Sequence, residues 1–554
     1  MNATEDEIHD LLAGFDNFVK IKDVRKRANR ISLLFVEFDH ILDLAEKDYK
    51  VEPDVKSGCF GREPRAFTNS CGFMSNGFTT EVRRQLGLSY PEPSAAQVNY
   101  LGFQGTLVLR DVPTNAPQVQ LRKSMQKFNI PNKEVRQHIP FIGILDYSKP
   151  HINGYLDTRL IKLLESRGVS MNHFLSLQKG YLDLLSKIPD NAASAQYFLR
   201  LTGRDAENIR SGIDGPTREV LTTIKRNEME EMIDRSYVLD AEDGEPPRSP
   251  VVRVRILVPD ARVVFGVCDP HDKLEKGQCY FKPTLQDDEA GECSSEEQIV
   301  VARYPCYHPG DIQVLKLTNG KPEYMDLKDC LVLPGKGHPF ESCEGDLSGH
   351  KFFVSWDQHL VPNLAIKSCS YSPTLTEYTS EAWAKLCAYV KWQFKGSRER
   401  KKKSRAELIQ HFVNFTDDLP QRIEKTYLKL AATHGPSSKE CIQLSKMWYK
   451  AANQTVDTEV LLRKLAKFEK NGKKKPSTTR SEEASSSEAS PLLRTGEEEP
   501  DGKEDEDVEM TTLDGTRSVP FLRRSSRETS ETRHEKWKEL EERAKRFVEE
   551  TLQE

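Results

Sequence analysis

The stretch from Leu333 to Pro362 reads LPGKGHPFESCEGDLSGHKFFVSWDQHLVP, and the interpretation of the chain starts from it. Its first half is rich in glycine, proline and acidic residues, which predicts a turn region. Its second half alternates through Phe352, Val354 and Trp356, which predicts a strand. A loop with carboxylates beside a strand is suited to a divalent cation, because Mg²⁺ prefers several oxygen ligands in octahedral geometry, usually with substrate phosphates.

This stretch resembles the signature loop of the eukaryotic cellular RNA-dependent RNA polymerases of RNA silencing. That family has His-Pro-x-Glu, a turn, Asp-Leu-Asp-Gly-Asp, an apolar strand and Trp-Asp. The matching residues here are His338, Pro339, Glu341, Asp346, Leu347, Gly349, Trp356, Asp357, Leu360 and Pro362. Ser348 and His350 stand at the positions of the family's second and third metal-binding aspartates, so only Asp346 remains of the three.

Further motifs resemble the same family and occur in the family's order. They are Phe67–Ser75, Gln97–Leu109, Leu121–Phe128, Leu274–Phe281 and Val300–Ile312. Arg122, Lys127 and Arg303 match cations of the family, and their reach suits phosphate or RNA backbone. Asn99 and Gln104 stand where the family has an arginine and a lysine. Without the resemblance, the cations at 122 and 127 would be interpreted as ordinary surface residues at a strand end.

The motif that ends in His308-Pro309-Gly310-Asp311 offers a candidate base or ligand at His308. A histidine in such a corner is more often a structural hydrogen-bonding residue, and we interpret His308 in that way. Asp311 is equally suited to capping the turn through its side chain.

The resemblance implies an α+β fold with two double-psi β-barrel domains joined by a helical connector, followed by a helical C-terminal module and a disordered tail. It implies that single-stranded RNA template and NTPs lie between the two barrels. The family's activity is template-directed synthesis of complementary RNA. Two Mg²⁺ ions stabilise the attacking and leaving oxygens in such a reaction.

The chain divides into seven predicted regions. They are an N-terminal helical segment (1–58), a first β-barrel-like domain (59–150), a helical connector (151–245), a second β-barrel domain with the degenerate loop (246–370), a helical module (371–465), a disordered Ser-rich and acidic linker (466–530) and an amphipathic helix (531–554). Few apolar residues in the linker predict disorder. The last helix has Trp537, Leu540, Ala544, Phe547 and Thr551 at helical spacing, which suits docking on a partner or on the body of the protein; a marginal, solvated helix is the alternative.

Two hypotheses about function follow from the loop. Ser348 offers a weak neutral oxygen, and His350 is a nitrogen ligand better matched to Zn, Ni or Cu than to Mg²⁺. Because even an outer-shell partner of a metal costs about 10–100-fold when it is lost, the sequence favours an impaired polymerase. The first hypothesis is an enzyme with Asp346 as the surviving ligand. The second is a non-catalytic module, derived from a polymerase, that binds RNA or silencing proteins.

Composition limits the remaining classes of protein. The 554 residues allow several domains, and the net charge is −5, with acidic residues concentrated late in the chain. The acidic start MNATEDEIHD has no apolar core, and no apolar run reaches the about 18 residues needed to span a bilayer. Eleven cysteines without a CxxC pair predict free thiols. We therefore expect an intracellular protein, cytoplasmic or nuclear, with no membrane partner.

Overall fold

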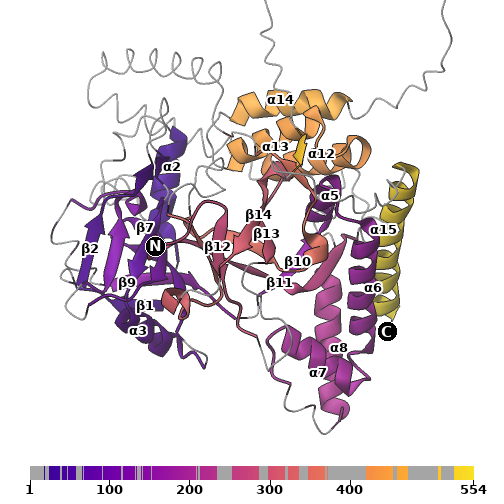
Figure 1. Cartoon of the computed structure of the whole chain (residues 1–554), viewed down its shortest axis with the longest axis horizontal. Coiled ribbons are helices and arrows are strands. Elements are labelled where there is room, and N and C mark those ends of the chain that lie inside the picture. The colour runs from indigo at the N-terminus through magenta and orange to yellow at the C-terminus, as the bar shows by residue number, and fades with distance from the viewer. Residues whose placement is uncertain are drawn as a thin grey trace, which may run out of the picture.

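The structure is a computed structural model of the 554-residue chain. It describes residues 24–37, 40–45, 48–57, 68–89, 92–113, 117–131, 141–150, 152–206, 212–233, 252–285, 297–318, 322–335, 347–368, 419–452, 458–471 and 530–553, with short pieces at 18, 65–66, 133, 136, 139, 209, 371 and 510–512. Figure 1 shows two sheets side by side, with helices packed against the second sheet.

The first sheet has seven strands in the order β1-β9-β6-β7-β5-β8-β2. These are β1 (His40–Asp43), β2 (Tyr49–Glu52), β5 (Cys71–Met74), β6 (Ala95–Tyr100), β7 (Phe103–Leu109), β8 (Val119–Arg122) and β9 (Phe141–Tyr147). Two pairs, β5 with β7 and β2 with β8, are parallel. Helix α3 (Asn76–Leu86) buries Phe78 and Val82 against this sheet, and Ser75 caps its start. The short hairpin β3 (Lys56–Ser57) and β4 (Arg65–Ala66) and helix α2 (Val24–Ser32) accompany the sheet.

A two-residue turn joins β6 to β7. Leu101 and Gly102 both have positive φ, of 47° and 85°, as a type I′ hairpin turn requires. Further along β7, a Cβ at Gly105 would lie 2.3 Å from the carbonyl oxygen of Ser70, so only glycine allows the turn before β5 to approach so closely. Both glycines belong to the Gln97–Leu109 motif.

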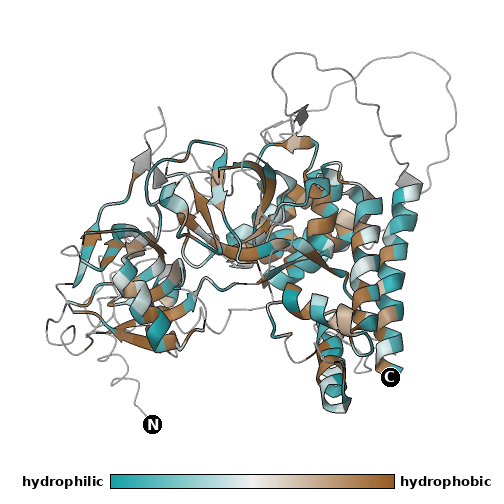
Figure 2. Cartoon of the chain, turned by 60° about the horizontal axis from the view of Figure 1, so that its bottom comes forward, coloured by the Kyte–Doolittle hydropathy of each residue, from teal (hydrophilic) through white to brown (hydrophobic). Residues whose placement is uncertain are grey.

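The second sheet closes on itself. Its strands are β10 (Asn153–Asp157), β11 (Arg255–Cys268), β12 (Gln278–Phe281), β13 (Gln298–Arg303), β14 (Ile312–Leu317), β15 (Cys330–Leu333) and β16 (Lys351–Ser355). The order is β10-β11-β15-β12-β14-β13-β16, and an additional pairing of β11 with β16 completes a ring from β11 to β16. Closure removes the exposed sheet edges of these strands. Figure 2 shows that the strands of this barrel consist largely of apolar residues.

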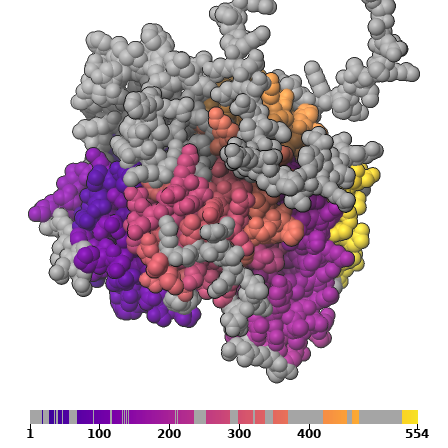
Figure 3. All heavy atoms as spheres, viewed as in Figure 1, coloured from indigo at the N-terminus to yellow at the C-terminus, as the bar shows by residue number. Residues whose placement is uncertain are grey.

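The two sheets share one apolar core. Cys71, Phe73 and Val108 of the first sheet belong to the same buried cluster as Phe281 and Phe352 of the second. Figure 3 shows the two regions, indigo to violet and pink, in contact along their length. The sheets are therefore packed as one unit rather than tethered by a linker.

Helices from distant parts of the chain cover the outer side of the second sheet. They are α5 (Thr158–Ser166), α6 (Met171–Lys187), α7 (Ala192–Leu201), α8 (Gly215–Glu230) and α15 (Ser530–Gln553). Side-chain oxygens of Asp157, Ser170, Asn191 and Asp214 cap the first four of these helices. Helix α15 lies along α6 and buries Trp537, Leu540, Ala544, Phe547 and Thr551, the stripe that the sequence predicts. Its apolar face is thus covered by the body of the protein itself.

A helical bundle stands next to α5, above the barrel in Figure 1. It consists of α12 (Leu419–His434), α13 (Lys439–Ala452) and α14 (Thr458–Asn471). Tyr307 joins it to the barrel by packing its ring against Tyr427, Trp448 and Tyr449. Short 3-10 turns complete the barrel region: η6 (Pro309–Asp311), η7 (Pro322–Tyr324) and η9 (Gln358–Leu360).

Two predicted regions differ from the structure. Within 1–58, which the sequence assigns to helix, His40–Asp43 and Tyr49–Glu52 are strands of the first sheet, whereas α2 and the 3-10 turn η2 (Leu33–Phe35) are helical. Pairing with β9 and β8 outweighs local propensity there. Within 466–530, α14 continues to Asn471, and β18 (Met510–Thr512) pairs with β17 (Leu364–Ile366). The remainder of that linker lies outside the described residues.

No described helix combines the length and the apolar character needed to cross a bilayer.

Candidate functional site

The described end of the degenerate loop, residues 347–350, is held against the first sheet. Leu347 donates its backbone N–H to the carbonyl of Asn69 across 3.1 Å, and the Thr106 hydroxyl donates to the carbonyl of Leu347 across 2.9 Å. Gly349 donates its N–H to Thr106 Oγ1 at 2.9 Å. Gly349 has a φ of +68°, and a Cβ there would lie 2.4 Å from Gln97 Nε2. Glycine at 349 is thus required by both conformation and space.

His350 is engaged by a cation. The Arg303 guanidinium, at the end of β13, donates from Nη2 to Nε2 of His350 across 2.5 Å. Because arginine offers donors only, this imidazole nitrogen must be the unprotonated acceptor. The lone pair that His350 would present to a metal ion is therefore occupied by Arg303.

The described residues of this loop offer few ligands for Mg²⁺. Residues 347–350 supply one hydroxyl and one imidazole, and no carboxylate. A hard cation of this size requires near-octahedral oxygen ligands. Asp346, the surviving aspartate, lies outside the described residues, as do His338, Pro339, Glu341 and Glu344. Residues 347–350 alone therefore do not fit Mg²⁺, the ion that the sequence resemblance implies.

The other two predicted cations make structural contacts. Arg122 is buried at the end of β8 and donates from Nη1 to the Pro53 carbonyl at 2.9 Å, with Glu52 Oε2 at 3.4 Å. Its Nε has no hydrogen-bond partner among the described residues. Lys127 donates from Nζ to Ser70 Oγ at 2.9 Å and to the Ser124 carbonyl at 3.1 Å. The structure brings Arg303 to the degenerate loop, whereas Arg122 faces a separate cavity.

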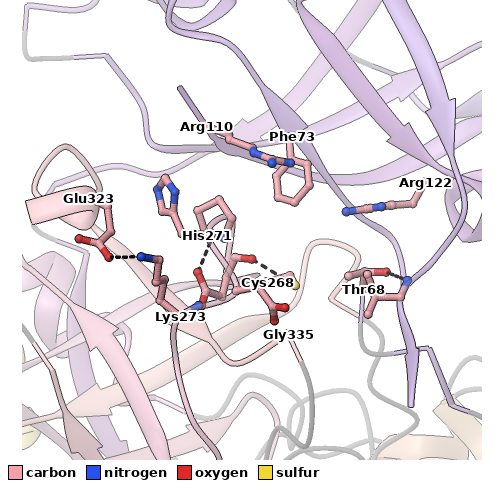
Figure 4. Close-up of a pocket in the computed structure, with 13 residues that line it drawn as sticks. Thr68, Phe73, Arg110, Arg122, Cys268, His271, Lys273, Glu323 and Gly335 are labelled. Carbon is pink, nitrogen blue, oxygen red and sulfur yellow. Dashed lines mark hydrogen bonds and ion pairs between the residues drawn. The ribbon is translucent and has the colours of Figure 1, made fainter. Parts of the chain in front are cut away.

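That cavity lies between the two sheets and has a volume of about 560 Å³. Figure 4 shows Phe73, Arg110 and Arg122 reaching it from the first sheet and His271, Lys273 and Glu323 from the second. Gly335, the last described residue before the degenerate loop, also lines it. Its volume is in the range of small-molecule sites in proteins, which are about 300–1,000 Å³.

Cations dominate the first-sheet wall of the cavity. The guanidinium carbons of Arg110 and Arg122 lie 4.8 and 4.9 Å from the centre of the Phe73 ring. The Arg110 guanidinium makes no hydrogen bond within the described part of the chain. Burial opposes ionisation of nearby Glu52, but the hydrogen bond from Lys50 and the charges of Lys50, Arg122 and Arg110 outweigh it and lower its pKa. The wall therefore retains donors for an anionic ligand.

A buried carboxylate organises the opposite wall. Asp269 accepts hydrogen bonds from the backbone N–H groups of His271, Lys273 and Leu274 at 2.7–2.8 Å, and from the Tyr324 hydroxyl at 2.9 Å. These bonds fix the loop that carries His271 and Lys273. The sequence motifs do not include Arg110, Asp269, His271 or Lys273; the only signal was a polar DPHDK run directly after a buried strand.

The thiols near this cavity are unreactive in character. Cys268 donates its backbone N–H to Cys71 Sγ at 3.3 Å, across the junction of the sheets. Burial raises the pKa of Cys71 to about 11, and burial also raises the pKa of Cys268. A thiol that stays protonated is a poor nucleophile, so these residues are part of the core.

His308 has the structural role that its sequence context predicts. Its Nδ1 accepts the backbone N–H of Gly310 at 3.0 Å and caps η6. Burial lowers the pKa of His308 to about 4. Asp311 does not cap the turn: its carboxylate accepts hydrogen bonds from the hydroxyls of Ser368, at 2.7 Å, and Tyr371. Burial raises the pKa of Asp311 to about 6 in spite of these hydrogen bonds.

Comparison with known proteins agrees with the motifs and the sheets described above. The family model described as RNA dependent RNA polymerase matches residues 1–474. The chain belongs to the RNA-dependent RNA polymerase family. It is 28% identical over 384 residues to "Probable RNA-dependent RNA polymerase 1" of Oryza sativa subsp. japonica, covering 66% of this chain and 47% of that protein.

Other members of the RNA-dependent RNA polymerase family give the same result. "RNA-dependent RNA polymerase 1" of Arabidopsis thaliana is 29% identical over 374 residues, which cover 66% of this chain and 31% of that protein. The solved structure of the RNA dependent RNA polymerase QDE-1 from Thielavia terrestris superimposes with a TM-score of 0.60 at 17% identity, covering 82% of this chain and 51% of that chain. The chain thus spans about half or less of the length of these relatives, and the likeness to the solved structure concerns the fold.

Proposed function

We propose that this chain is an RNA-silencing member of the polymerase family that binds single-stranded RNA and NTPs between its two sheets, and in which template-directed RNA synthesis is severely impaired. The pairing of Arg303 with His350 carries this proposal. It occupies the position of the family's third aspartate with a neutral imidazole and a guanidinium. Such a pair repels a metal ion where the family attracts one.

The barrel supports the structural half of the proposal. Its closed ring contains two parallel pairs, β11 with β15 and β12 with β14, between otherwise antiparallel strands. We interpret this ring as a double-psi β-barrel and the first sheet as its counterpart. The region boundaries at 58, 150, 245, 370, 465 and 530 remain predictions, as does a cytoplasmic or nuclear location.

The cavity supports the binding half of the proposal. Arg110 and Arg122 border the same space as His271 and Lys273, next to Gly335 at the start of the degenerate loop. Arginine is suited to phosphate because its planar donors match two phosphate oxygens. Phe73 adds an aromatic face in the same wall, of the kind on which bases stack. A phosphate-bearing ligand of nucleotide size is the class that this combination suits.

The catalytic half of the proposal is tested by NTP incorporation on a single-stranded RNA template, with Mg²⁺ and separately with Mn²⁺. The wild-type chain is compared with Asp346→Ala. We expect both proteins to show the same residual incorporation. Robust incorporation that disappears in Asp346→Ala would establish an active enzyme and overturn the proposed impairment.

The binding half is tested by titrating single-stranded RNA at several salt concentrations. Arg110→Met removes one cation of the cavity, and Arg84→Met removes an exposed, ion-paired arginine of α3 as the matched control. Loss of one phosphate contact should lower the slope of log K against log salt by about 0.7 for a single strand. Equal slopes for Arg110→Met, Arg84→Met and wild type would exclude the cavity as the RNA site.

A further inference from the structure

A second cluster of metal-ligand side chains lies away from the degenerate loop. It consists of His173 on α6, Asp357 after β16 and His359 in η9, and one ligand atom of each lies within 4.8 Å of the others. His350 and Asp357 stand at opposite ends of β16, so the two positions are about 20 Å apart along an extended strand. This cluster is thus independent of the polymerase loop and of the cavity.

The contacts inside the cluster are close. His173 Nε2 lies 2.7 Å from Asp357 Oδ2, and His359 Nδ1 lies 3.3 Å from Asp357 Oδ1. The two imidazole rings stack with their centres 4.9 Å apart and an angle of 26° between their planes. A tetrahedral ion bound at about 2.0–2.1 Å places its ligand atoms about 3.3 Å apart. The cluster approaches this spacing and reaches it through small rotations about side-chain bonds.

The backbone already holds the central ligand in place. The Asp357 carboxylate accepts the backbone N–H of His359 at 2.9 Å and so begins η9. The backbone N–H of Asp357 donates to Ser355 Oγ at 3.3 Å. His173 sits in the first turn of α6, which packs against the barrel. Two ligands therefore come from one rigid turn and the third from a different element.

Exposure differs across the cluster in a way that suits an ion at the surface. The Asp357 side chain is 10% exposed and that of His173 is 20% exposed, whereas that of His359 is 79% exposed. The inner two ligands are fixed by packing, and the outer one is free to adjust. Water has access on the His359 side, as a site with three protein ligands requires to complete its coordination.

Negative charge collects beside the cluster. Asp260, on β11, lies beside the end of β16, where its backbone carbonyl accepts the N–H of Trp356 at 3.0 Å and the hydroxyl of Ser355 at 2.9 Å. The positive end of the α6 dipole disfavours a cation at this place. This effect is modest and screened by solvent, and the two carboxylates, Asp260 and Asp357, outweigh it.

We propose that His173, Asp357 and His359 form a binding site for a divalent transition-metal ion of the Zn²⁺ class, which fastens helix α6 to the end of the second barrel. Two imidazoles and one carboxylate are ligands that zinc accepts, and hard Mg²⁺ does not favour nitrogen. The competing interpretation is a hydrogen-bonded His–Asp pair with a histidine stacked on it. The two interpretations differ in whether the cluster binds an ion.

The test is metal binding by the full chain, stripped with a chelator and kept reduced with a phosphine. Zn²⁺ is titrated calorimetrically, and Co²⁺ is titrated in parallel with its visible absorption as the readout. His359→Ala is the principal variant, because this side chain is 79% exposed and the only packing that its removal loses is the stacking on His173. His173→Ala and Asp357→Asn test the inner ligands, and His434→Ala, an exposed histidine at the end of α12, is the matched control.

We expect one tight ion in wild type and in His434→Ala, with affinity at least about 100-fold weaker in His359→Ala, since even outer-shell partners are worth about 10–100-fold. Bound Co²⁺ should lack the strong near-ultraviolet band of thiolate ligation. Equal affinities in wild type and His359→Ala, a thiolate band, or no binding by the wild type would each overturn the proposal. None of these readouts requires RNA or NTPs, so they are independent of the proposed function.

Discussion

Arg303 and His350 form a direct contact, Nη2 to Nε2 at 2.5 Å, at the edge of the loop where the family places its third metal-binding aspartate. The same loop is fixed to the first sheet by Thr106, which both donates to Leu347 and accepts from Gly349. The loop is therefore held by protein–protein hydrogen bonds. In this chain the Arg303 guanidinium pairs with an imidazole at that position.

Restoring the carboxylates should restore chemistry if their loss is the cause of impairment. In Ser348→Asp/His350→Asp, residue 350 becomes a carboxylate partner for Arg303 and both lost ligand positions are refilled. We expect Mg²⁺-dependent NTP incorporation to rise at least about tenfold above wild type. Template-dependent incorporation of labelled NTP measures it, and Ser348→Ala/His350→Ala is the control. A double variant that gains nothing while still binding RNA would assign the impairment to regions beyond this loop.

The buried carboxyl of Asp311 should make stability depend on pH in a specific direction. Its pKa in the folded protein, about 6, lies above the ordinary 3.8, so the folded state binds more protons between these values. The stability it contributes is present below pH 4 and is lost as the pH rises through 6, by about 3 kcal/mol in total. The variant Asp311→Asn has no ionisable group at this position, so its stability does not fall in this way as the pH rises.

The difference in free energy of unfolding between Asp311→Asn and wild type should therefore shift in favour of the variant as the pH rises from 4 to 7. Thermal melts at half-unit pH steps measure it. His308 has a pKa of about 4 and contributes in the opposite sense, with stability rising over pH 4–6.5, but it is present in both proteins and cancels in the difference. A difference that stays constant with pH would show that Asp311 ionises normally.

Local sequence patterns predicted those helices and strands whose formation does not depend on pairing with a distant segment. The apolar stripe of α15 was readable because a 3.6-residue period is a property of the segment alone. The pairing of His40 with Ile144 and of Tyr49 with Val119 could not be predicted in this way, because each strand pairs with a strand 70 or more residues later. Short strands of this kind carry little propensity of their own.

The residues of the candidate site also divide into those that belong to a sequence motif and those that meet only through folding. Arg122 and Arg303 were identified because they belong to motifs, and the structure places one at the cavity and the other at the degenerate loop. Arg110, His271 and Lys273 belong to no recognised motif and meet only because the two sheets pack together. His173 and Asp357 likewise meet only through the packing of α6 on the barrel.

The docking of α15 should depend on Trp537. Its ring is buried, its Nε1 donates to Glu165 Oε2 at 3.0 Å, and Lys162 Nζ lies 3.8 Å from the ring centre. Trp537→Ala should lower the local opening free energy of α15 by about 3–5 kcal/mol. Trp537→Phe, which loses mainly the hydrogen bond, should cost about 1 kcal/mol.

Hydrogen exchange of the α15 amides measures this local opening directly. Lys538→Ala is the matched control, since its side chain is exposed on the same helix and should change the value by less than about 0.5 kcal/mol. Unchanged exchange in Trp537→Ala would mean that α15 does not rest on α6 in solution, and its apolar face would then be available to a partner.

An ion pair between the two sheets, Lys351 with Asp146, should contribute more to the free energy of unfolding than the more exposed pair of Lys149 with the same carboxylate. Lys351 Nζ, at the start of β16, donates to Asp146 Oδ2 of β9 at 2.8 Å and lies 3.5 Å from the centre of the Phe265 ring. Lys149 Nζ contacts the other oxygen of the same carboxylate at 3.0 Å, but its side chain is 42% exposed against 26% for Lys351. Burial lowers the pKa of Lys351 in spite of its hydrogen bond to Asp146. Burial opposes ionisation of Asp146 as well, but the hydrogen bonds from Lys351 and Lys149 outweigh it and lower the pKa of Asp146.

A double-mutant cycle with Lys351→Met and Asp146→Asn should give a coupling of about 1 kcal/mol that falls little in high salt, because partly buried pairs are weakly screened. The cycle with Lys149→Met in place of Lys351→Met should give about 0.3 kcal/mol and lose it in salt. Thermal melts of each variant at low and high salt provide both values. Equal couplings in the two cycles would show that Lys351 adds no more to the junction of the sheets than a surface lysine, and that the shared apolar core holds the sheets together without it.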